Sequence, residues 1–281
     1  MSRILVLNAT GKVSSNLIER LVADGHAVTA ASRNPSEPST DAIRRVHFDY
    51  EDPSTFEAAL ADVDRLFWLG PPAIVDSASY CKAFFDVALQ QVDKVVLMTA
   101  QGVDVDDSIP LRQLELRVAD SGVNWTVIRP SWFMDNFHTF WVEPMRGDGV
   151  IPVPAGEAAS AFIDAGDIAA SAAAALTDDS TNGQAYVLTG PESLTYAEAA
   201  EVLSAAAGRT IRYLPIDDET FVAAMVGVGL PADYAGFLDA LFQAVRAGAA
   251  AQTTDGVERL TGRAPRTLAD YAAEHADAWQ G

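Results

Sequence analysis

With 281 residues, the chain is long enough to bury a sizeable core in one large domain with a lid or in two modest domains. Its 39 Asp and Glu residues outnumber its 19 Lys and Arg residues, giving a formal charge of −20, and so acidic a surface excludes nucleic acid as an expected partner. The single cysteine, Cys81, excludes an intrachain disulfide and fits a reducing compartment, and we expect it to pack on an apolar helix face.

The sequence contains no segment that predicts export or membrane insertion. The first apolar run begins at Arg3 without a charged region and a long apolar stretch, so we expect no signal peptide. No apolar run reaches the roughly 18 residues that a membrane-spanning helix needs. We therefore expect a cytoplasmic protein without a membrane partner.

Residues 3–25, RILVLNATGKVSSNLIERLVADG, form the first predicted unit. Arg3 to Leu7 is expected to be a buried strand, Asn8 to Gly11 a tight turn, and Lys12 to Ala23 an amphipathic helix that Gly25 closes. A strand that turns directly into a helix directs backbone N–H groups and the positive end of the helix dipole toward one point. The unit therefore predicts a phosphate-binding site.

The turn departs from the dinucleotide pattern G-x-x-G-x-x-G at two of its three glycines, because Asn8, Gly11 and Ser14 stand at these positions. Asn is the residue other than glycine that most readily adopts a left-handed backbone, so the turn itself can form. The Asn8 side chain, however, projects toward space that a pyrophosphate needs. Two interpretations stay open: a tolerated variant that still binds a cofactor, and a site that has weakened or lost it.

Short apolar runs then alternate with predicted helices as far as residue 130. This alternation is typical of a parallel sheet that is covered on both faces, and it predicts a Rossmann-like, doubly wound α/β fold. The expected strands are Ala27 to Arg33, Val46 to Tyr50, Arg65 to Leu69, Lys94 to Ala100, Asn124 to Pro130 and Gln184 to Gly190, and the expected helices are Pro53 to Ala61 with Asp52 as N-cap, Ser77 to Gln91, and Pro110 to Asp120.

The regular alternation ends at Ser131, where SWFMDNFHTFWVEP places five aromatic residues and a histidine within fourteen positions. IPVPAGE is expected to be a loop, AFIDAGDIAASAAAALTDD a short strand and an Ala-rich helix, IRYLPI a strand, and the rest mainly helical. We expect residues 1–130, continued by about 160–190, to form an NAD(P)-binding core. Residues 131–159 and 191–281 would form a smaller, mainly helical substrate-binding part or lid.

Several blocks in a fixed order resemble the NmrA-like group of atypical short-chain dehydrogenase/reductases. They are NATGKV, ASR, HFDYED, SGVNWTVIRPSWFMDNF, FIDAGDIA, YVLTGPESLTYAEAAEVLS and LTGRAPRTLADYA, so the similarity covers the full length. The group comprises NAD(P)H-binding proteins, including quinone and azo or triphenylmethane dye reductases and redox-sensing regulators. The resemblance implies an NAD(P)H site in the first turn and at the strand ends.

The expected cofactor is NADPH rather than NADH, because Arg33 stands at the end of the second strand, where an acid would bind the ribose of NAD. Lys12 adds a second positive charge. The residues expected to contact the cofactor are Asn8, Thr10, Gly11, Lys12, Val13, Arg33, Asp49, Leu69, Gly70, Pro71 and Thr99.

Candidate catalytic residues are few, because no tyrosine is followed four positions later by a lysine. Thr99 is the best remaining hydroxyl, and satisfying backbone groups at its strand end is the competing interpretation. His138 is a candidate general acid. Glu115 matches an acidic position of the family, or is an exposed partner of Arg112 or Arg117. No metal site is predicted.

The aromatic block is the expected substrate wall, in which Trp132, Phe133 and Phe137 suit a flat apolar molecule and Asn136 offers hydrogen bonds. Trp68 is expected to be a core residue instead. These features together favour an NADPH-dependent reductase of quinone-like or other conjugated aromatic molecules. The alternatives are a non-catalytic NADP-binding redox sensor and a cofactor-free enzyme of a cyclisation or isomerisation. The expected partners are a small aromatic or quinone-like substrate and a second copy of the chain in a homodimer, and the redox sensor would report to a partner protein.

Overall fold

The computed structural model describes residues 2–35 and 37–280, and Ser36, within the predicted loop after the second strand, lies outside the described residues. The chain forms two compact units. Unit 1 comprises Met1–Pro130 and Gly166–Val187, and unit 2 comprises Ser131–Ala165 and Leu188–Gly281. Across the described ranges, no helix combines the length and apolar character needed to cross a membrane.

Unit 1 is built on a seven-stranded sheet with the order β3-β2-β1-β4-β5-β6-β9. Neighbouring strands from β3 to β6 pair in parallel, and backbone bonds from Gly183 to Trp125 and from Ser131 to Leu188 keep β9 in the same direction beside β6. The strands are β1 (Arg3–Val6), β2 (Ala27–Ser32), β3 (Ile43–His47), β4 (Arg65–Leu69), β5 (Lys94–Met98), β6 (Asn124–Pro130) and β9 (Gln184–Leu188). The predicted doubly wound parallel sheet is confirmed.

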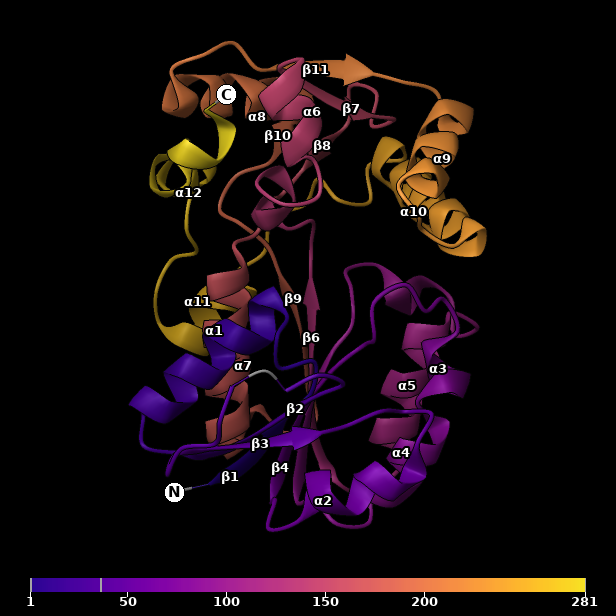
Figure 1. The fold of residues 1–281 in the computed structure, drawn as a ribbon, viewed down its shortest axis with the longest axis vertical. Coiled ribbons are helices and arrows are strands. Elements are labelled where there is room, and N and C mark those ends of the chain that lie inside the picture. Colours follow the sequence, from indigo (N-terminus) through magenta and orange to yellow (C-terminus); the bar gives the residue numbers. More distant parts are fainter. Residues whose placement is uncertain (1, 36, 281) are drawn as a thin grey trace. The chain divides into compact units, whose positions relative to one another are not determined.

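Helices cover both faces of this sheet, α1 and α7 on one side and α3, α4 and α5 on the other (Figure 1). The helices and 3-10 turns of unit 1 are α1 (Lys12–Ala23), η1 (Pro53–Thr55), α2 (Phe56–Leu60), α3 (Ser77–Tyr80), α4 (Lys82–Ala88), η2 (Val103–Val105), α5 (Pro110–Ala119), α7 (Ala165–Thr177) and η4 (Asp179–Thr181). Buried residues of α1 recur every three or four positions, as in Val13, Leu17 and Leu21, because this spacing places them on the sheet side.

Two predicted helices of unit 1 have different outcomes in the structure. Asp52 is the predicted N-cap, and its carboxylate accepts from the Ser54 N–H at 3.0 Å, so that prediction is confirmed. The helix expected over Ser77 to Gln91 is wrong as a single element, since it divides into α3 and α4 at Cys81. The Cys81 side chain is fully buried at this joint, as predicted, and burial raises the pKa of its thiol to about 12.

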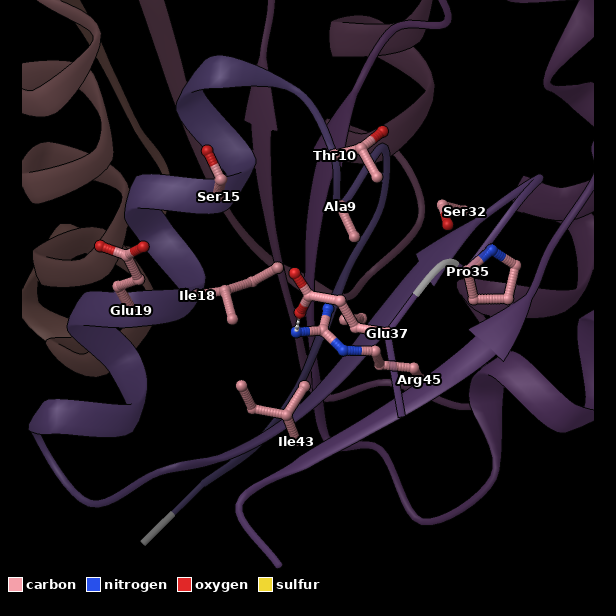
Figure 2. A pocket seen from close by; sticks show the side chains of 11 residues that line it. Ala9, Thr10, Ser15, Ile18, Glu19, Ser32, Pro35, Glu37, Ile43 and Arg45 are labelled. Carbon is pink, nitrogen blue, oxygen red and sulfur yellow. Dashed lines mark hydrogen bonds and ion pairs between the residues drawn. The ribbon is translucent and has the colours of Figure 1, made fainter. Parts of the chain in front are cut away.

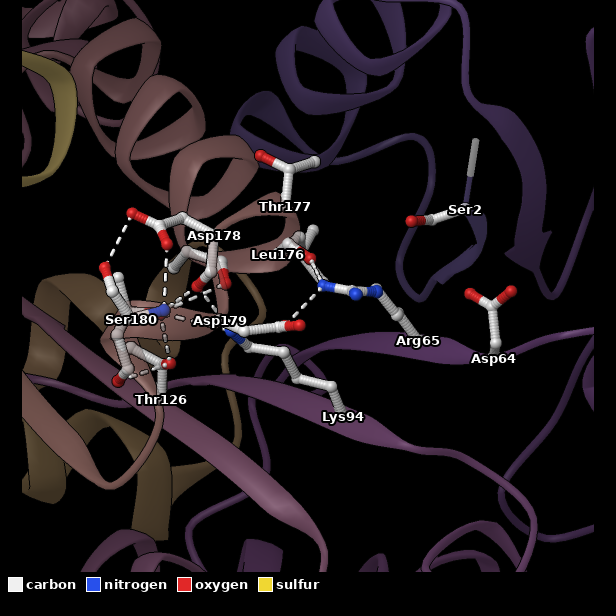
Figure 3. A network of polar contacts seen from close by, with 12 residues as sticks. Ser2, Asp64, Arg65, Lys94, Thr126, Leu176, Thr177, Asp178, Asp179 and Ser180 are labelled. Atoms are coloured by element: carbon white, nitrogen blue, oxygen red, sulfur yellow. Dashed lines mark hydrogen bonds and ion pairs between the residues drawn. The ribbon is translucent and has the colours of Figure 1, made fainter.

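A buried lysine stabilises the amino-terminal edge of the sheet (Figure 3). Lys94, the first residue of β5, donates from Nζ to the Asp178 carbonyl at 2.8 Å and to Thr181 Oγ1 at 3.1 Å. Its side chain is 2% exposed, and burial lowers the pKa of its ammonium group to about 8, although the charge of Asp179 opposes the shift. Lys94 thus joins β5 to the segment after α7, at the edge opposite the strand ends where a cofactor binds in this type of fold.

Unit 2 consists of helices and two small sheets around an aromatic core. Its elements are η3 (Met134–Phe137), α6 (Val142–Gly147), β7 (Val150–Val153), β8 (Ala159–Ser160), β10 (Leu194–Thr195), α8 (Tyr196–Ala207), β11 (Arg212–Pro215), α9 (Asp218–Gly227), α10 (Ala232–Arg246), α11 (Gly256–Thr261), α12 (Leu268–Glu274) and η5 (Ala276–Trp279). The loop expected for IPVPAGE is wrong over its first part, because β7 pairs in parallel with β11. Helix α8 begins with a complete capping box formed by Thr195 and Glu198.

Candidate cofactor site

The turn after β1 adopts the backbone that the sequence predicts. Asn8 has φ of 51°, in the left-handed region, and the Gly11 N–H donates to the Asn8 carbonyl at 2.8 Å to close the turn. The Asn8 side chain is held as well, because Nδ2 donates to the carbonyls of Leu69 at 2.9 Å and Gly70 at 3.0 Å. Both amide hydrogens are therefore used in joining the carboxyl ends of β1 and β4.

This junction is the point at which the strand order of the sheet reverses. Strand β1 lies between β2 and β4, so the chain builds the sheet outward in both directions from it. Ligands of open α/β sheets bind in the crevice at the carboxyl ends of the strands beside such a point. Asn8 and Gly11 thus lie where a dinucleotide-binding fold places its cofactor.

Ser14 replaces the last glycine of the pattern without opening the contact between helix and strand. Its side chain is fully buried, and Oγ donates to the Leu7 carbonyl at 2.8 Å. A buried hydroxyl is costly unless it is hydrogen-bonded, and here the strand end supplies the acceptor. The substitution therefore adds a bond between α1 and β1 while keeping them packed.

The start of α1 is suited to an anion. Its N-cap, Gly11, has no side chain to bond the first backbone N–H groups, and the first turn contains no acidic residue. The intrahelical bonds begin with Ser15 N–H to the Gly11 carbonyl at 2.8 Å. A helix start of this kind leaves N–H donors for an outside acceptor and favours negative charge. Thr10 is exposed beside it, and the Val13 side chain is buried, so Val13 can offer only its backbone.

A pocket of about 330 Å³ lies between α1, β2 and β3 in unit 1 (Figure 2). Its lining residues come from the first turn, from the helix and from the two strands with their connecting loop: Ala9, Thr10, Ser15, Ile18, Glu19, Ala30, Ser32, Pro35, Glu37, Ile43 and Arg45. Arg33 is exposed and is not among them, and its carbonyl accepts from His47 Nδ1 at 2.8 Å.

Arg45 and Glu37 are functional candidates that the sequence reasoning missed. They form an ion pair in the pocket, as the dashed line in Figure 2 marks. The sequence holds one indication of their position. Side chains alternate along β3, so Arg45, two positions after Ile43, lies on the same side of the strand as Ile43. Nothing local in the sequence determines which side faces the pocket.

The other predicted cofactor residues at the strand ends are engaged in local structure. The Asp49 carboxylate accepts from the Glu51 N–H at 3.0 Å, and its carbonyl accepts from Thr55 Oγ1 at 3.2 Å. Leu69 and Gly70 accept from Asn8, and Pro71 follows them. Trp68, fully buried against Phe85 with ring centroids 5.6 Å apart, is the core residue that the sequence predicts.

A buried charge cluster holds Thr99 at the end of β5. Thr99 Oγ1 donates to Glu115 Oε1 at 2.7 Å, and Arg129 donates to both oxygens of Glu115, from Nε at 2.9 Å and from Nη2 at 2.8 Å. Arg112 Nη1 adds a bond of 2.9 Å, and Arg129 also pairs with Asp104. Burial opposes ionisation, but these hydrogen bonds outweigh it and lower the pKa of Glu115.

This cluster changes two sequence-based expectations. Of the two interpretations of Glu115, the exposed partner is wrong, since the residue is only 3% exposed, although Arg112 is indeed a partner. The hydroxyl proton of Thr99 is directed to a carboxylate rather than to backbone groups. Thr99 therefore presents oxygen lone pairs, and not a proton, to any further partner.

The aromatic block lies in unit 2, and its members differ in burial. Phe137 is fully buried in the core against Phe162, at 5.1 Å between ring centroids, so it supports the fold and has no surface for a substrate. Trp132 and Phe133 are half-buried, and the Trp132 ring packs on Phe242 at 4.6 Å. Asn136 is also half-buried, and its carbonyl accepts from the Trp141 N–H at 2.9 Å.

His138 belongs to a ring cluster in unit 2. Its Nδ1 shares a hydrogen bond with the hydroxyl of Tyr271, and its ring stacks on His275 at 4.4 Å with an interplanar angle of 11°. Tyr271 is buried, which raises the pKa of its phenol. The imidazole orientation of His138 is thus fixed from two sides. Within the described ranges, no three His, Cys, Asp or Glu side chains gather in a way that could hold a metal ion.

The fold and the turn define a class: Rossmann-like proteins that bind a nicotinamide dinucleotide at the switch point of the sheet. Comparison with known proteins agrees, since residues 9–179 match a family described as NAD(P)H-binding. The chain belongs to this family of NAD(P)H-binding proteins, and its relatives include oxidoreductases. The resemblance inferred from the sequence blocks is thereby confirmed.

Two curated relatives and one solved structure illustrate the match. The uncharacterized oxidoreductase YesF of Bacillus subtilis is 38% identical over 280 residues, covering 98% of this chain and 96% of YesF. The NAD(P)H azoreductase of Xenophilus azovorans is 33% identical over 285 residues, covering 98% and 99%. An NADPH-dependent quinone oxidoreductase from Escherichia coli, solved with NADPH, has a TM-score of 0.84 at 24% identity and covers 96% and 99%.

Proposed function

We propose that this protein is an NADPH-dependent reductase of quinone-like or other conjugated aromatic small molecules. The observation that carries the proposal is the start of α1, which has an uncapped Gly11 and no acid in its first turn, at the switch point of the sheet. The altered positions Asn8 and Ser14 support it, because both side chains bond to the strand ends. The similarity to a named azoreductase supports the substrate class.

The residues of unit 1 fit a dinucleotide phosphate. Backbone N–H groups of the first helical turn would bind the pyrophosphate, with Lys12 nearby and Arg33 toward a 2′-phosphate. NADPH, when bound, supplies a hydride. The proposed contacts are Asn8, Thr10, Gly11, Lys12, Val13, Arg33, Asp49, Leu69, Gly70, Pro71 and Thr99.

Thr99 acts in this proposal as a hydrogen-bond acceptor. Its proton is committed to Glu115, which Arg129 keeps ionised, so the Thr99 oxygen can receive a donor such as a carboxamide N–H. The cluster therefore positions Thr99, and a role as proton donor does not fit it.

In unit 2 we propose Trp132, Phe133 and Asn136 as substrate contacts. Two half-buried rings suit a planar molecule, and the Asn136 side-chain amide has no hydrogen-bond partner among the described residues. A conjugated acceptor delocalises the charge that reduction creates, so the missing Tyr-x-x-x-Lys pair is compatible with turnover. Water or His138 would deliver the completing proton, and the pH profile of His138→Gln distinguishes these two sources.

The test is a screen of quinones and azo dyes for loss of the nicotinamide absorbance of NADPH, without oxygen. We expect turnover with some of these acceptors and a reduced kcat/KM in Trp132→Ala. Binding of NADPH without turnover of any acceptor would instead favour the redox sensor. Absence of NADPH binding would favour the cofactor-free alternative.

A further inference from the structure

We propose that Arg45 recognises the 2′-phosphate of NADPH in the pocket between α1, β2 and β3, and that Glu37 competes with this phosphate for Arg45. The inference rests on the proposed binding of NADPH. It assigns cofactor selectivity to a pair of residues in β3 and in the loop before it, in addition to Arg33 at the end of β2.

The guanidinium of Arg45 has unused donors in a sheltered place. Its side chain is 21% exposed, and the described part of the chain supplies one acceptor for it, the Glu37 carboxylate bonded to Nη2. The Nε–H is buried and has no hydrogen-bond partner among the described residues. A buried, unsatisfied N–H is costly, so a ligand oxygen that reaches it would gain binding free energy.

Arg44, the residue before Arg45 in β3, differs from it because its guanidinium donates to backbone carbonyls of the protein. Arg44 faces the other side of β3, where Nη1 donates to the Ala58 carbonyl at 2.8 Å and Nη2 donates to the Ala61 carbonyl at 2.6 Å. Arg44 Nη2 also reaches Thr29 Oγ1 at 3.0 Å. Arg44 thus makes three hydrogen bonds to the protein, and these hold α2 on the sheet. Arg45 has no such structural commitment, and its backbone register beside Ala30 directs it to the pocket.

The rest of the pocket suits a phosphate monoester. Thr10 and Ser32 line it, and neither hydroxyl makes a hydrogen bond to another described residue, so both can donate. Ser32 ends β2, at the place where this type of fold holds the adenosine ribose. Arginine and two hydroxyls are donors that bind phosphate oxygens well.

Glu37 gives the site its selectivity. Its side chain is 66% exposed, so it can leave Arg45 without breaking buried structure. A 2′-phosphate that binds the unused donors of Arg45 lies near the charge of this carboxylate and competes with it for the guanidinium, whereas the uncharged 2′-hydroxyl of NADH is not repelled. The pair therefore lowers the advantage of NADPH over NADH below what Arg45 alone would confer.

Calorimetric titration of the full-length protein tests this assignment. The probes are adenosine 2′,5′-bisphosphate and adenosine 5′-monophosphate, followed by NADPH and NADH. The variants are Arg45→Ala, Arg45→Lys and Glu37→Gln, with the exposed residues Arg20→Ala and Glu57→Gln as charge-matched controls outside the pocket.

We expect Arg45→Ala to weaken the bisphosphate roughly 10- to 100-fold, as for a lost hydrogen-bonded charge, and the monophosphate less than about threefold. Arg45→Lys should keep part of the affinity, and Glu37→Gln should tighten the bisphosphate several-fold, while the controls match the wild type. If Arg45→Ala binds each probe with the same affinity as the wild type does, Arg45 has no role in recognising the 2′-phosphate. An unchanged affinity in Glu37→Gln would overturn the competition.

These outcomes are separable from failure of the proposed function. If the wild type binds NADPH while Arg45→Ala keeps the same preference over NADH, only this inference falls. If the wild type binds neither NADPH nor the bisphosphate, the proposed cofactor site falls with it.

Discussion

The side-chain amide of Asn8 donates to the backbone carbonyl of Leu69 at 2.9 Å, so the turn after β1 is tied to the end of β4. The glycine that the dinucleotide pattern expects could make no such bond. The bond explains how the chain tolerates the change, because the same side chain that departs from the pattern also fixes the left-handed turn.

Replacing Asn8 separates the structural role of this amide from any effect on the cofactor. Asn8→Gly loses two hydrogen bonds and should lower the free energy of unfolding by about 1–2 kcal/mol, and Asn8→Ala by about 1 kcal/mol more, since alanine is strained at this φ. Urea unfolding measures both. NADPH affinity in Asn8→Gly should stay within about threefold of the wild type. A gain of tenfold or more would show that the amide occupies phosphate space.

Removing Arg129 should expose the cost of the buried carboxylate of Glu115. Arg129→Met leaves that carboxylate in a site that is 3% exposed, and we expect a loss of about 3–5 kcal/mol in the free energy of unfolding. Arg112 is half-buried, so we expect Arg112→Met to lower the free energy of unfolding by only about 0–1 kcal/mol.

Acid should act on the same pair in a direction that can be worked out. The folded pKa of Glu115 lies below its ordinary value of 4.5, so its contribution is complete above that pH and is lost as the pH falls through the folded pKa. In Arg129→Met the carboxylate is penalised near neutral pH and relieved by protonation. The difference in the free energy of unfolding between the wild type and Arg129→Met should therefore become smaller in acid. A gap that stays constant down to about pH 4 would contradict the account.

Lys94 should make stability rise with pH in mildly alkaline solution. Its pKa is about 8 in the folded protein against an ordinary 10.5, so the unfolded chain binds more protons between these values. The wild type should gain roughly 1–2 kcal/mol relative to Lys94→Met between about pH 7.5 and 9.5. Urea unfolding at the two pH values tests this, and a constant difference between the proteins would contradict it.

Arg33→Ala should weaken NADPH about tenfold and NADH little, because a 2′-phosphate and not a 2′-hydroxyl needs the arginine. The comparison uses dissociation constants, with Arg20→Ala as the control. Equal weakening of the two cofactors would remove the 2′-phosphate role from Arg33.

The doubly wound parallel sheet of unit 1 could be predicted because its short apolar runs and the helices between them are local patterns in the sequence. Strand β7 could not, since Pro152 and Pro154 interrupt its pattern and its partner β11 lies some sixty residues later, with Val150 paired to Arg212. The break of the long helix at Cys81 likewise has no local breaker.

The site was less predictable because its side chains meet across elements. Glu115 and Arg129 lie on a helix and a strand, and only the fold brings them together. The side of β3 on which Arg45 lies depends on pairing with β2. A segment rich in aromatic residues is typical of either a core or a pocket. The structure distinguishes the two cases, because Phe137 is fully buried in the core and Trp132 is only partly buried.

Calorimetric titration of the wild-type protein decides whether a turn with one of three glycines still binds NADPH. We expect saturable binding of one NADPH per chain, tighter than that of NADH. If neither NADPH nor NADP⁺ binds detectably up to about millimolar concentration, the turn does not hold the cofactor. A dissociation constant of about 1 mM corresponds to a binding free energy of about −4 kcal/mol.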